Sequence, residues 1–238
     1  MIDVKARVQA LGRRDLPSSL DLPYMGHVEE RLLYAWTKRF IDLIISAIAL
    51  LVLSPVLAAI ALAVRLDSPG PALFAQRRVG KGGKEFTLVK FRSMYYGADE
   101  GIHRAFAKQY IHGQCEVDGN TCFKPKDDPR VTRVGKFLRM TSLDELPQLW
   151  NVLKGDMSMV GPRPAVRYEV EEYERWQLQR LAVLPGLTGL AQVSGRSSLA
   201  FNAIARLDVQ YTEERNLWLD LWILVMTVPV VLLAKAAR

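Results

Sequence analysis

Cysteine is scarce in this chain of 238 residues, which has only Cys115 and Cys122. Two cysteines are too few to hold a disulfide scaffold together, and they indicate a reducing compartment, although they could still pair in an oxidising one. Histidine is nearly as rare, and His103 and His112 precede the cysteines without any recognised zinc spacing. We therefore expect no zinc site in this segment.

Acidic side chains are in the minority, with 25 Asp and Glu residues against 32 Lys and Arg residues and a net charge of +7. This excess predicts anionic partners such as nucleic acid, lipid head groups or phosphorylated substrates. Aromatic residues are not interleaved with the basic ones in any reader pattern, so we expect no nucleic acid partner. The glycines of VGKGGK (residues 79–84) lack the GxxxxGK[ST] spacing, which excludes a P-loop.

Long apolar runs are abundant, and the first extends from Phe40 to Val64. As one straight helix it would measure about 37 Å at about 1.5 Å per residue, enough to cross a bilayer core of about 30 Å. We expect no signal peptide here, because the run is too long and begins too far along the chain. It predicts a membrane helix instead.

A proline near the middle of this run bears on its topology. Pro55 removes a backbone N–H donor, so we expect a kink or break at Ser54-Pro55, with the Ser54 hydroxyl satisfying the freed carbonyl. Basic residues flank both ends, at Lys38, Arg39 and Arg65, whereas a simple span is usually biased to one side. We interpret the run as a helix that enters one leaflet and returns. From these residues alone, an ordinary kinked transmembrane helix stays open.

The second apolar run, NLWLDLWILVMTVPVVLLAKAAR, occupies residues 216–238. Its Trp218 and Trp222 are amphipathic rings that favour a membrane interface. We expect an interfacial amphipathic helix rather than a second crossing. The alternative is a buried core helix.

The sequence between the two runs is typical of a soluble domain. Residues 72–78 and 85–92 predict two short strands joined as a hairpin, whereas 97–126 is polar and irregular and predicts a long surface loop or lid. Residues 168–182 have a helical pattern and many charges, which indicates a solvated face. The expected fold class is α+β and mainly helical. The expected divisions are an N-terminal extension (1–37), a re-entrant membrane helix (38–66), a cytosolic catalytic domain (67–216) and a C-terminal interfacial helix (217–238).

The stretch SLDELPQLW places Asp144 and Glu145 side by side, two residues before Pro147. If Asp144 is a helix N-cap, the proline falls within the first turn, where it costs little. If Ser142 is the cap, Glu145 completes a capping box but the proline forfeits a hydrogen bond. Simple capping would explain the two acids in either case.

A basic shell around the acids suggests more than capping. Lys136, Arg139 and Lys154 surround them, and the turn Gly161-Pro162-Arg163-Pro164 presents a further arginine. Arginine binds phosphate oxygens with two parallel hydrogen bonds. An ionised carboxylate can attack phosphorus, and a neighbouring carboxylate can hold Mg²⁺.

The run DPRVTRVGKFLRMTSLDELPQLWNVLKGDMSMVGPRP, with FTLVKFRSM before it and LPGLTGLAQVSGR after it, resembles the bacterial sugar transferases of the monotopic phosphoglycosyl transferase family. The resemblance covers the chain from about Lys38 onward, and its motifs are long and ordered. The Ser54-Pro55 step is similar to the break in the family's re-entrant membrane helix. The chain resembles the catalytic core of the family with a short extension.

The resemblance implies transfer of a sugar-1-phosphate from a nucleoside diphosphate sugar, usually a UDP-sugar, to polyprenol (undecaprenyl) phosphate. This reaction starts glycan assembly at the cytoplasmic face of the bacterial inner membrane, where the enzyme would also contact membrane phospholipids. Asp144 matches the acid that attacks the sugar-bearing phosphorus with release of UMP, and Glu145 matches the acid that helps to bind Mg²⁺, so both are candidate metal ligands. Further positions that match the family, and that we expect to bind substrate, are Lys90, Arg92, Arg139, Arg163, Gln192, Arg196 and Asp208.

Two other functions compete with this interpretation. A membrane-attached module could hold a lipid or sugar nucleotide in the basic groove without turnover. A sugar-nucleotide hydrolase would use water rather than lipid phosphate as the final acceptor. Both would contain the same basic shell, so only an assay of the products distinguishes them from the transferase.

Overall fold

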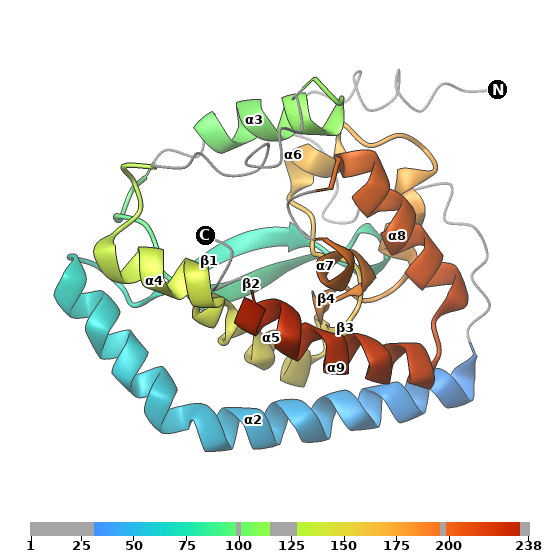
Figure 1. Ribbon diagram of the computed structural model, residues 1–238, viewed down its shortest axis with the longest axis horizontal. Helices are drawn as coiled ribbons and strands as arrows, with labels where there is room; N and C mark the ends of the chain where they lie inside the picture. The colour runs from blue at the N-terminus through green and yellow to red at the C-terminus, as the bar shows by residue number, and fades with distance from the viewer. Residues whose placement is uncertain (1–30, 99–100, 115–127, 196–198, 234–238) are drawn as a thin grey trace.

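The computed structural model describes residues 31–98, 101–114, 128–195 and 199–233. These ranges are mainly helical with two small sheets, which confirms the expected α+β class. Figure 1 shows the longest helix curving along one side of the other elements. In chain order the elements are α2 (Leu32–Asp67), β1 (Leu73–Val79), η1 (Lys81–Gly83), β2 (Glu85–Phe91), α3 (Gly101–Ile111), α4 (Arg133–Thr141), η2 (Leu143–Glu145), α5 (Gln148–Lys154), β3 (Ser158–Val160), α6 (Arg167–Val170), η3 (Gln177–Ala182), β4 (Gly186–Thr188), α7 (Leu190–Ser194), α8 (Phe201–Glu214) and α9 (Leu217–Leu233).

The long helix α2 runs without interruption through Pro55. Of the predicted kink or break at Ser54-Pro55, the break does not form, and Figure 1 shows the helix changing direction near its middle instead. The Ser54 hydroxyl donates a hydrogen bond of 2.7 Å to the Leu51 carbonyl, which is the acceptor that the proline leaves without an N–H donor. The helix continues because this side chain replaces the lost bond, as the sequence suggested.

The outward face of α2 is apolar. Leu51, Val52 and Leu62 are each exposed over more than half of their surface. By length and composition, α2 is the one helix among the described residues that could cross a membrane. A soluble environment would leave this surface in contact with water, which is unfavourable for so large an apolar patch.

The first part of α2 is bound to the globular part of the chain by polar side chains. Arg39 donates hydrogen bonds to backbone carbonyls at the end of α5. Asp42, buried although it lies in an apolar helix, accepts a hydrogen bond of 3.0 Å from the Met159 N–H in β3. Lys38 forms an ion pair of 2.8 Å with the buried carboxylate of Asp220 in α9. These contacts fix the start of α2 against α5, β3 and α9.

The last turn of α2 is bound to the same globular part. The Arg92 guanidinium group donates to the carbonyls of Ser68 at 2.7 Å and Val64 at 3.2 Å. The Asp67 carboxylate accepts a hydrogen bond of 3.0 Å from the Val134 N–H at the start of α4. Both ends of the apolar helix therefore lie against one body of packed elements.

The predicted hairpin is confirmed. Strands β1 and β2 are antiparallel, with Gln76 opposite Leu88, and their connection is the expected glycine-containing segment. Buried Phe86 and Leu88 of β2 pack against Val152 and Met157, which joins the hairpin to α5. A second sheet, in which β3 and β4 pair in parallel, was not predicted.

Two expectations for the middle of the chain are wrong. Part of the stretch 97–126 forms α3 rather than an irregular loop, and Ala107 and Tyr110 on this helix are buried. The charged segment 168–182 is not a solvated face, because Gln177 and Arg180 are almost fully buried. Charge alone did not reveal that these side chains find partners inside the domain.

The C-terminal helix α9 combines the two alternatives considered for it. Asp220 and Ile223 are buried against the core, whereas Trp218 is 80% exposed and Trp222 is 47% exposed. One face of α9 therefore belongs to the core. The other presents two tryptophans to the surroundings.

Candidate active site

The two adjacent acids lie on a short turn between two helices. Ser142 ends α4 in the left-handed conformation, with φ 58° and ψ 16°, and the turn η2 then holds Asp144 and Glu145. Pro147 is the N-cap of α5, where its missing N–H has no consequence. Neither predicted cap forms, because the Ser142 side chain makes no capping hydrogen bond and α5 begins after both acids.

The acids have different surroundings. Asp144 is 8% exposed and lies in the packed region between α4, β2 and α5, whereas Glu145 is exposed. A buried carboxylate requires compensating charge or hydrogen bonds.

Lys90 of β2 supplies part of this charge. Burial, together with the positive charges of Arg78, Arg139 and Arg163, lowers its pKa from 10.5 to about 8, and the Asp144 carboxylate opposes this shift. These five side chains come from β1, β2, η2, α4 and the turn after β3, and four of them are close enough to Lys90 to influence its pKa. Several cations gathered around one carboxylate form a site suited to a multiply charged anion.

The arginines of this cluster differ in their burial. Arg78 is buried, donates to the Pro164 carbonyl at 3.0 Å, and has an Nε without a hydrogen-bond partner among the described residues. Arg139 is half-buried on α4, and Arg163 is exposed in the turn that Pro164 closes. The site thus has a fixed inner arginine and an outer arginine at the surface.

Arg92 and Asp208 have other surroundings in the structure. Arg92 is 4% exposed, and its guanidinium group binds carbonyls at the end of α2. Asp208 is 1% exposed and forms a buried ion pair with Arg180 of η3. Burial raises the pKa of Asp208, while the Arg180 and Arg163 charges oppose this shift. Both residues are therefore engaged by partners inside the domain.

Gln192 and Arg196 are the remaining expected substrate-binding residues. Gln192 lies on α7, half-buried, and its Oε1 is buried without a hydrogen-bond partner among the described residues. Arg196 lies outside the described residues. For Gln192, the described residues show no side-chain hydrogen bond from its Oε1 to the cluster around Lys90.

Sequence reasoning missed three residues of this region. Arg78 was predicted only as part of a strand. A charged side chain on the buried face of a two-stranded hairpin is nevertheless a signal by which a functional residue could have been detected. Arg180 and Glu169 lay in the segment interpreted as solvated, and both are at least nine-tenths buried. No local signal marks Arg180, because its partner Asp208 is distant in sequence.

The described residues contain no cluster of three or more His, Cys, Asp or Glu side chains that could hold a metal ion. Two adjacent carboxylates, Asp144 and Glu145, are nevertheless a sufficient protein contribution for Mg²⁺, which commonly takes its other ligands from water and substrate phosphates. The donor set therefore fits magnesium with a phosphorylated ligand. It does not fit a zinc site built from protein side chains alone.

Residues 33–234 match the family described as bacterial sugar transferase. The galactosyl transferase CpsE of Streptococcus agalactiae is 45% identical over 84% of this chain and 43% of its own length. The undecaprenyl-phosphate galactose phosphotransferase of Salmonella typhimurium is 44% identical over 82% of this chain and 40% of its own length. The UDP-glucose:undecaprenyl-phosphate glucose-1-phosphate transferase of Xanthomonas campestris is 40% identical over 89% of this chain and 42% of its own length.

This chain spans less than half the length of these three relatives. The region they share with it includes α2, the acid pair and the basic cluster, which are the features that the structure brings together. With a match that extends over most of its length, the chain belongs to the bacterial sugar transferase family.

Proposed function

We propose that this protein transfers a sugar-1-phosphate from a UDP-sugar to undecaprenyl phosphate, or a similar polyprenol phosphate, and so starts the assembly of a membrane-linked glycan. The observation that carries the proposal is the buried carboxylate of Asp144, whose charge acts on Lys90 together with the charges of Arg139 and Arg163. A carboxylate among cations can meet an anionic phosphate that it could not approach unaided. The names of the relatives support a UDP-sugar as the donor and undecaprenyl phosphate as the acceptor.

The chemistry follows from two displacements at one phosphorus atom. An Asp144 oxygen attacks the sugar-bearing phosphorus, the bond from this phosphorus to the bridging oxygen breaks, and UMP leaves with that oxygen. An oxygen of the lipid phosphate then attacks the same phosphorus and releases the aspartate. The sugar-phosphate is thereby joined to the lipid, and the carboxylate is regenerated.

The cations around Asp144 have separate tasks in this scheme. Lys90 and Arg139 stabilise the charge on the phosphoryl oxygens, and Arg163, at the surface, binds the phosphate groups as the donor enters. Asp144 and Glu145 would hold Mg²⁺ together with the donor phosphates, and the ion would neutralise part of their charge. Exposed Glu145 is well placed to reach such an ion from the solvent side.

The contacts of α2 support a re-entrant topology at the cytoplasmic face of the bacterial inner membrane. Arg39 and Arg92 bind opposite ends of the apolar segment to one globular body. If the segment crossed the bilayer, its two ends would lie on opposite sides and could not both contact that body. We infer that the middle of α2 dips into one leaflet, with the exposed tryptophans of α9 at the same interface.

The proposal is tested by an assay of UMP release. The purified protein, in lipid nanodiscs with Mg²⁺, is incubated with a panel of UDP-sugars, with and without undecaprenyl phosphate. The expected result is many turnovers of UMP release from one or a few donors, only when the lipid phosphate is present. Equal turnover without the lipid would identify a hydrolase, and donor binding without any release would identify a binding module; either result would contradict the proposal.

A further inference from the structure

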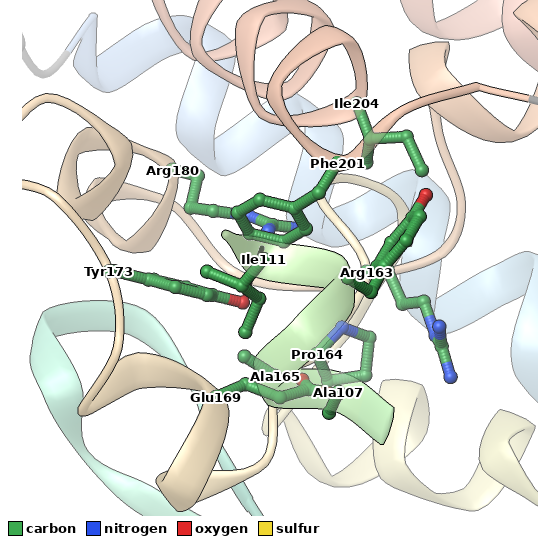
Figure 2. Close-up of a pocket in the computed structure, with 11 residues that line it drawn as sticks. Ala107, Ile111, Arg163, Pro164, Ala165, Glu169, Tyr173, Arg180, Phe201 and Ile204 are labelled. Carbon is green, nitrogen blue, oxygen red and sulfur yellow. Dashed lines mark hydrogen bonds between the residues drawn. The ribbon is translucent and has the colours of Figure 1, made fainter. Parts of the chain in front are cut away.

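A small pocket lies beside Arg163 and has no task in the chemistry above. Its walls come from α3, α6, η3, α8 and the turn after β3, as Figure 2 shows. The cavity has a volume of about 50 Å³. Because one water molecule needs roughly 10–15 Å³ on this measure, the cavity has room for a few heavy atoms but not for a nucleoside.

One side of the pocket is apolar. Two helices supply this apolar lining: α3 with Ala107 and Ile111, and α8 with Phe201 and Ile204. Ala107 is 3% exposed, so its methyl group belongs to the wall and not to the surface of the helix. A wall of this kind discriminates ligands by the size of the group that enters.

The other side carries fixed polar groups. The Glu169 carboxylate lines the pocket and is oriented by a hydrogen bond of 2.9 Å from the Val166 N–H. The Tyr173 hydroxyl accepts a hydrogen bond of 3.1 Å from Arg180, and burial raises its pKa, so the phenol keeps a proton that it can donate. A carboxylate and a phenol oriented in this way can bind hydroxyl or amide groups on a ring.

Arg163 connects this pocket with the phosphate site. It lines the cavity, and its charge also lowers the pKa of Lys90 next to Asp144. The group directly bonded to the phosphate under attack is the sugar. The base is separated from that phosphate by a second phosphate and a ribose. Adjacency therefore favours the sugar as the occupant, in agreement with the small volume.

We propose that this pocket receives a substituent of the donor's sugar ring and selects which sugar is transferred. Ala107, Ile111 and Ile204 set the size of the accepted substituent, and Glu169 and Tyr173 bind its polar atoms. The inference rests on the proposed function, because it takes a UDP-sugar as the donor. It assigns substrate selection to α3, a helix that the sequence did not predict.

The test fills the pocket with Ala107→Leu and compares it with Ala105→Leu, the same change at an exposed position of the same helix. The KM of each UDP-sugar and the inhibition constant of UDP, which has no sugar, are measured for both variants. Ala107→Leu is expected to raise the KM of the preferred donor at least about tenfold, since a pocket discriminates single methylene groups by about that factor, and to leave UDP inhibition unchanged. Ala105→Leu is expected to change neither constant.

A second variant keeps the test decisive if Ala107→Leu does not fold. Ile204→Ala enlarges the pocket and is expected to raise kcat/KM for donors with bulkier substituents relative to the preferred donor. Unchanged donor selection in both variants would overturn the proposal. Equal increases in the donor KM and in the UDP inhibition constant would overturn it as well, because they would place the nucleoside in the pocket. If the wild-type protein releases no UMP, the function itself fails, and calorimetric binding of UDP-sugar against UDP then tests the pocket separately.

Discussion

The Arg39 guanidinium group of α2 donates a hydrogen bond of 2.6 Å to the Val152 carbonyl near the end of α5. A second bond of 2.9 Å reaches the Leu153 carbonyl, so one arginine donates to two carbonyls in the last turn of α5, one of which, Val152, also accepts from the Gly155 N–H. The other end of α5 directly follows the acid pair. Helix α2 is therefore joined through one short helix to the site where Asp144 lies.

Replacing Arg39 with alanine is expected to destabilise the protein. The change removes two charge-assisted hydrogen bonds and leaves the carbonyls of α5 without these donors, which should lower the free energy of unfolding by about 1–3 kcal/mol. Denaturant unfolding in detergent measures the difference. Arg65→Ala, an exposed arginine of the same helix, serves as the control and should have little effect. Equal stability of the two variants would mean that these bonds do not hold α2 in place.

The activity should depend on the protonation of Lys90. Its pKa is lowered to about 8, so the side chain is charged below that pH and loses its charge as the pH rises through it. Because the charged form binds phosphate, kcat/KM for the donor should fall above pH 8. Lys90→Arg stays charged and should move the fall to higher pH, whereas exposed Lys84→Arg on the same hairpin should not. Identical pH profiles for all three proteins would remove Lys90 from the phosphate site.

The position of α4 depends on the glycine at 135. A Cβ atom there would lie 2.0 Å from the Ser93 carbonyl oxygen, a backbone atom that cannot move aside. Gly135→Ala should therefore displace α4, which carries Arg139, and should cost about 1–3 kcal/mol of stability with a loss of activity. Chemical denaturation and the UMP assay measure the two effects, with Arg133→Ala, at an exposed position of the same helix, as control. A fully active and stable Gly135→Ala variant would contradict the close packing of α4.

Glu145→Gln separates metal binding from folding. Glu145 is exposed, so the neutral side chain should leave stability unchanged while it raises the Mg²⁺ concentration needed for half-maximal activity. A magnesium titration of the UMP assay provides the measurement, and exposed Glu213→Gln is the matched control. An unaltered titration curve would count against Glu145 as a metal ligand.

Periodicity predicted the elements that are regular and long. The hairpin β1–β2 and helix α2 follow directly from alternation and from apolar length, and Ser54 could be assigned its hydrogen bond from the position of Pro55 alone. Strands β3 and β4 have three residues each, too few to show alternation, and α3 lay within a stretch interpreted as loop. Short elements depend on their tertiary neighbours, which a single sequence does not display.

The site was predictable where charges are close in sequence or belong to long motifs. Asp144, Lys90, Arg139 and Arg163 were all proposed from the sequence, and the charges of the other three act on Lys90. The buried pair of Arg180 and Asp208 was not, because each partner alone is typical of an exposed residue. Burial of a charge becomes visible only when its partner is brought close by folding.

Covalent attachment of sugar-phosphate to Asp144 is the central claim, and intact-protein mass spectrometry tests it most directly. The protein is mixed with Mg²⁺ and its UDP-sugar in the absence of lipid acceptor, quenched in acid and weighed, together with Asp144→Asn and the control Asp156→Asn. The account predicts an added mass of one sugar-phosphate on the wild-type and Asp156→Asn proteins, lost on addition of undecaprenyl phosphate, and none on Asp144→Asn. No adduct on the wild-type protein, or transfer at the normal rate by Asp144→Asn, would contradict it.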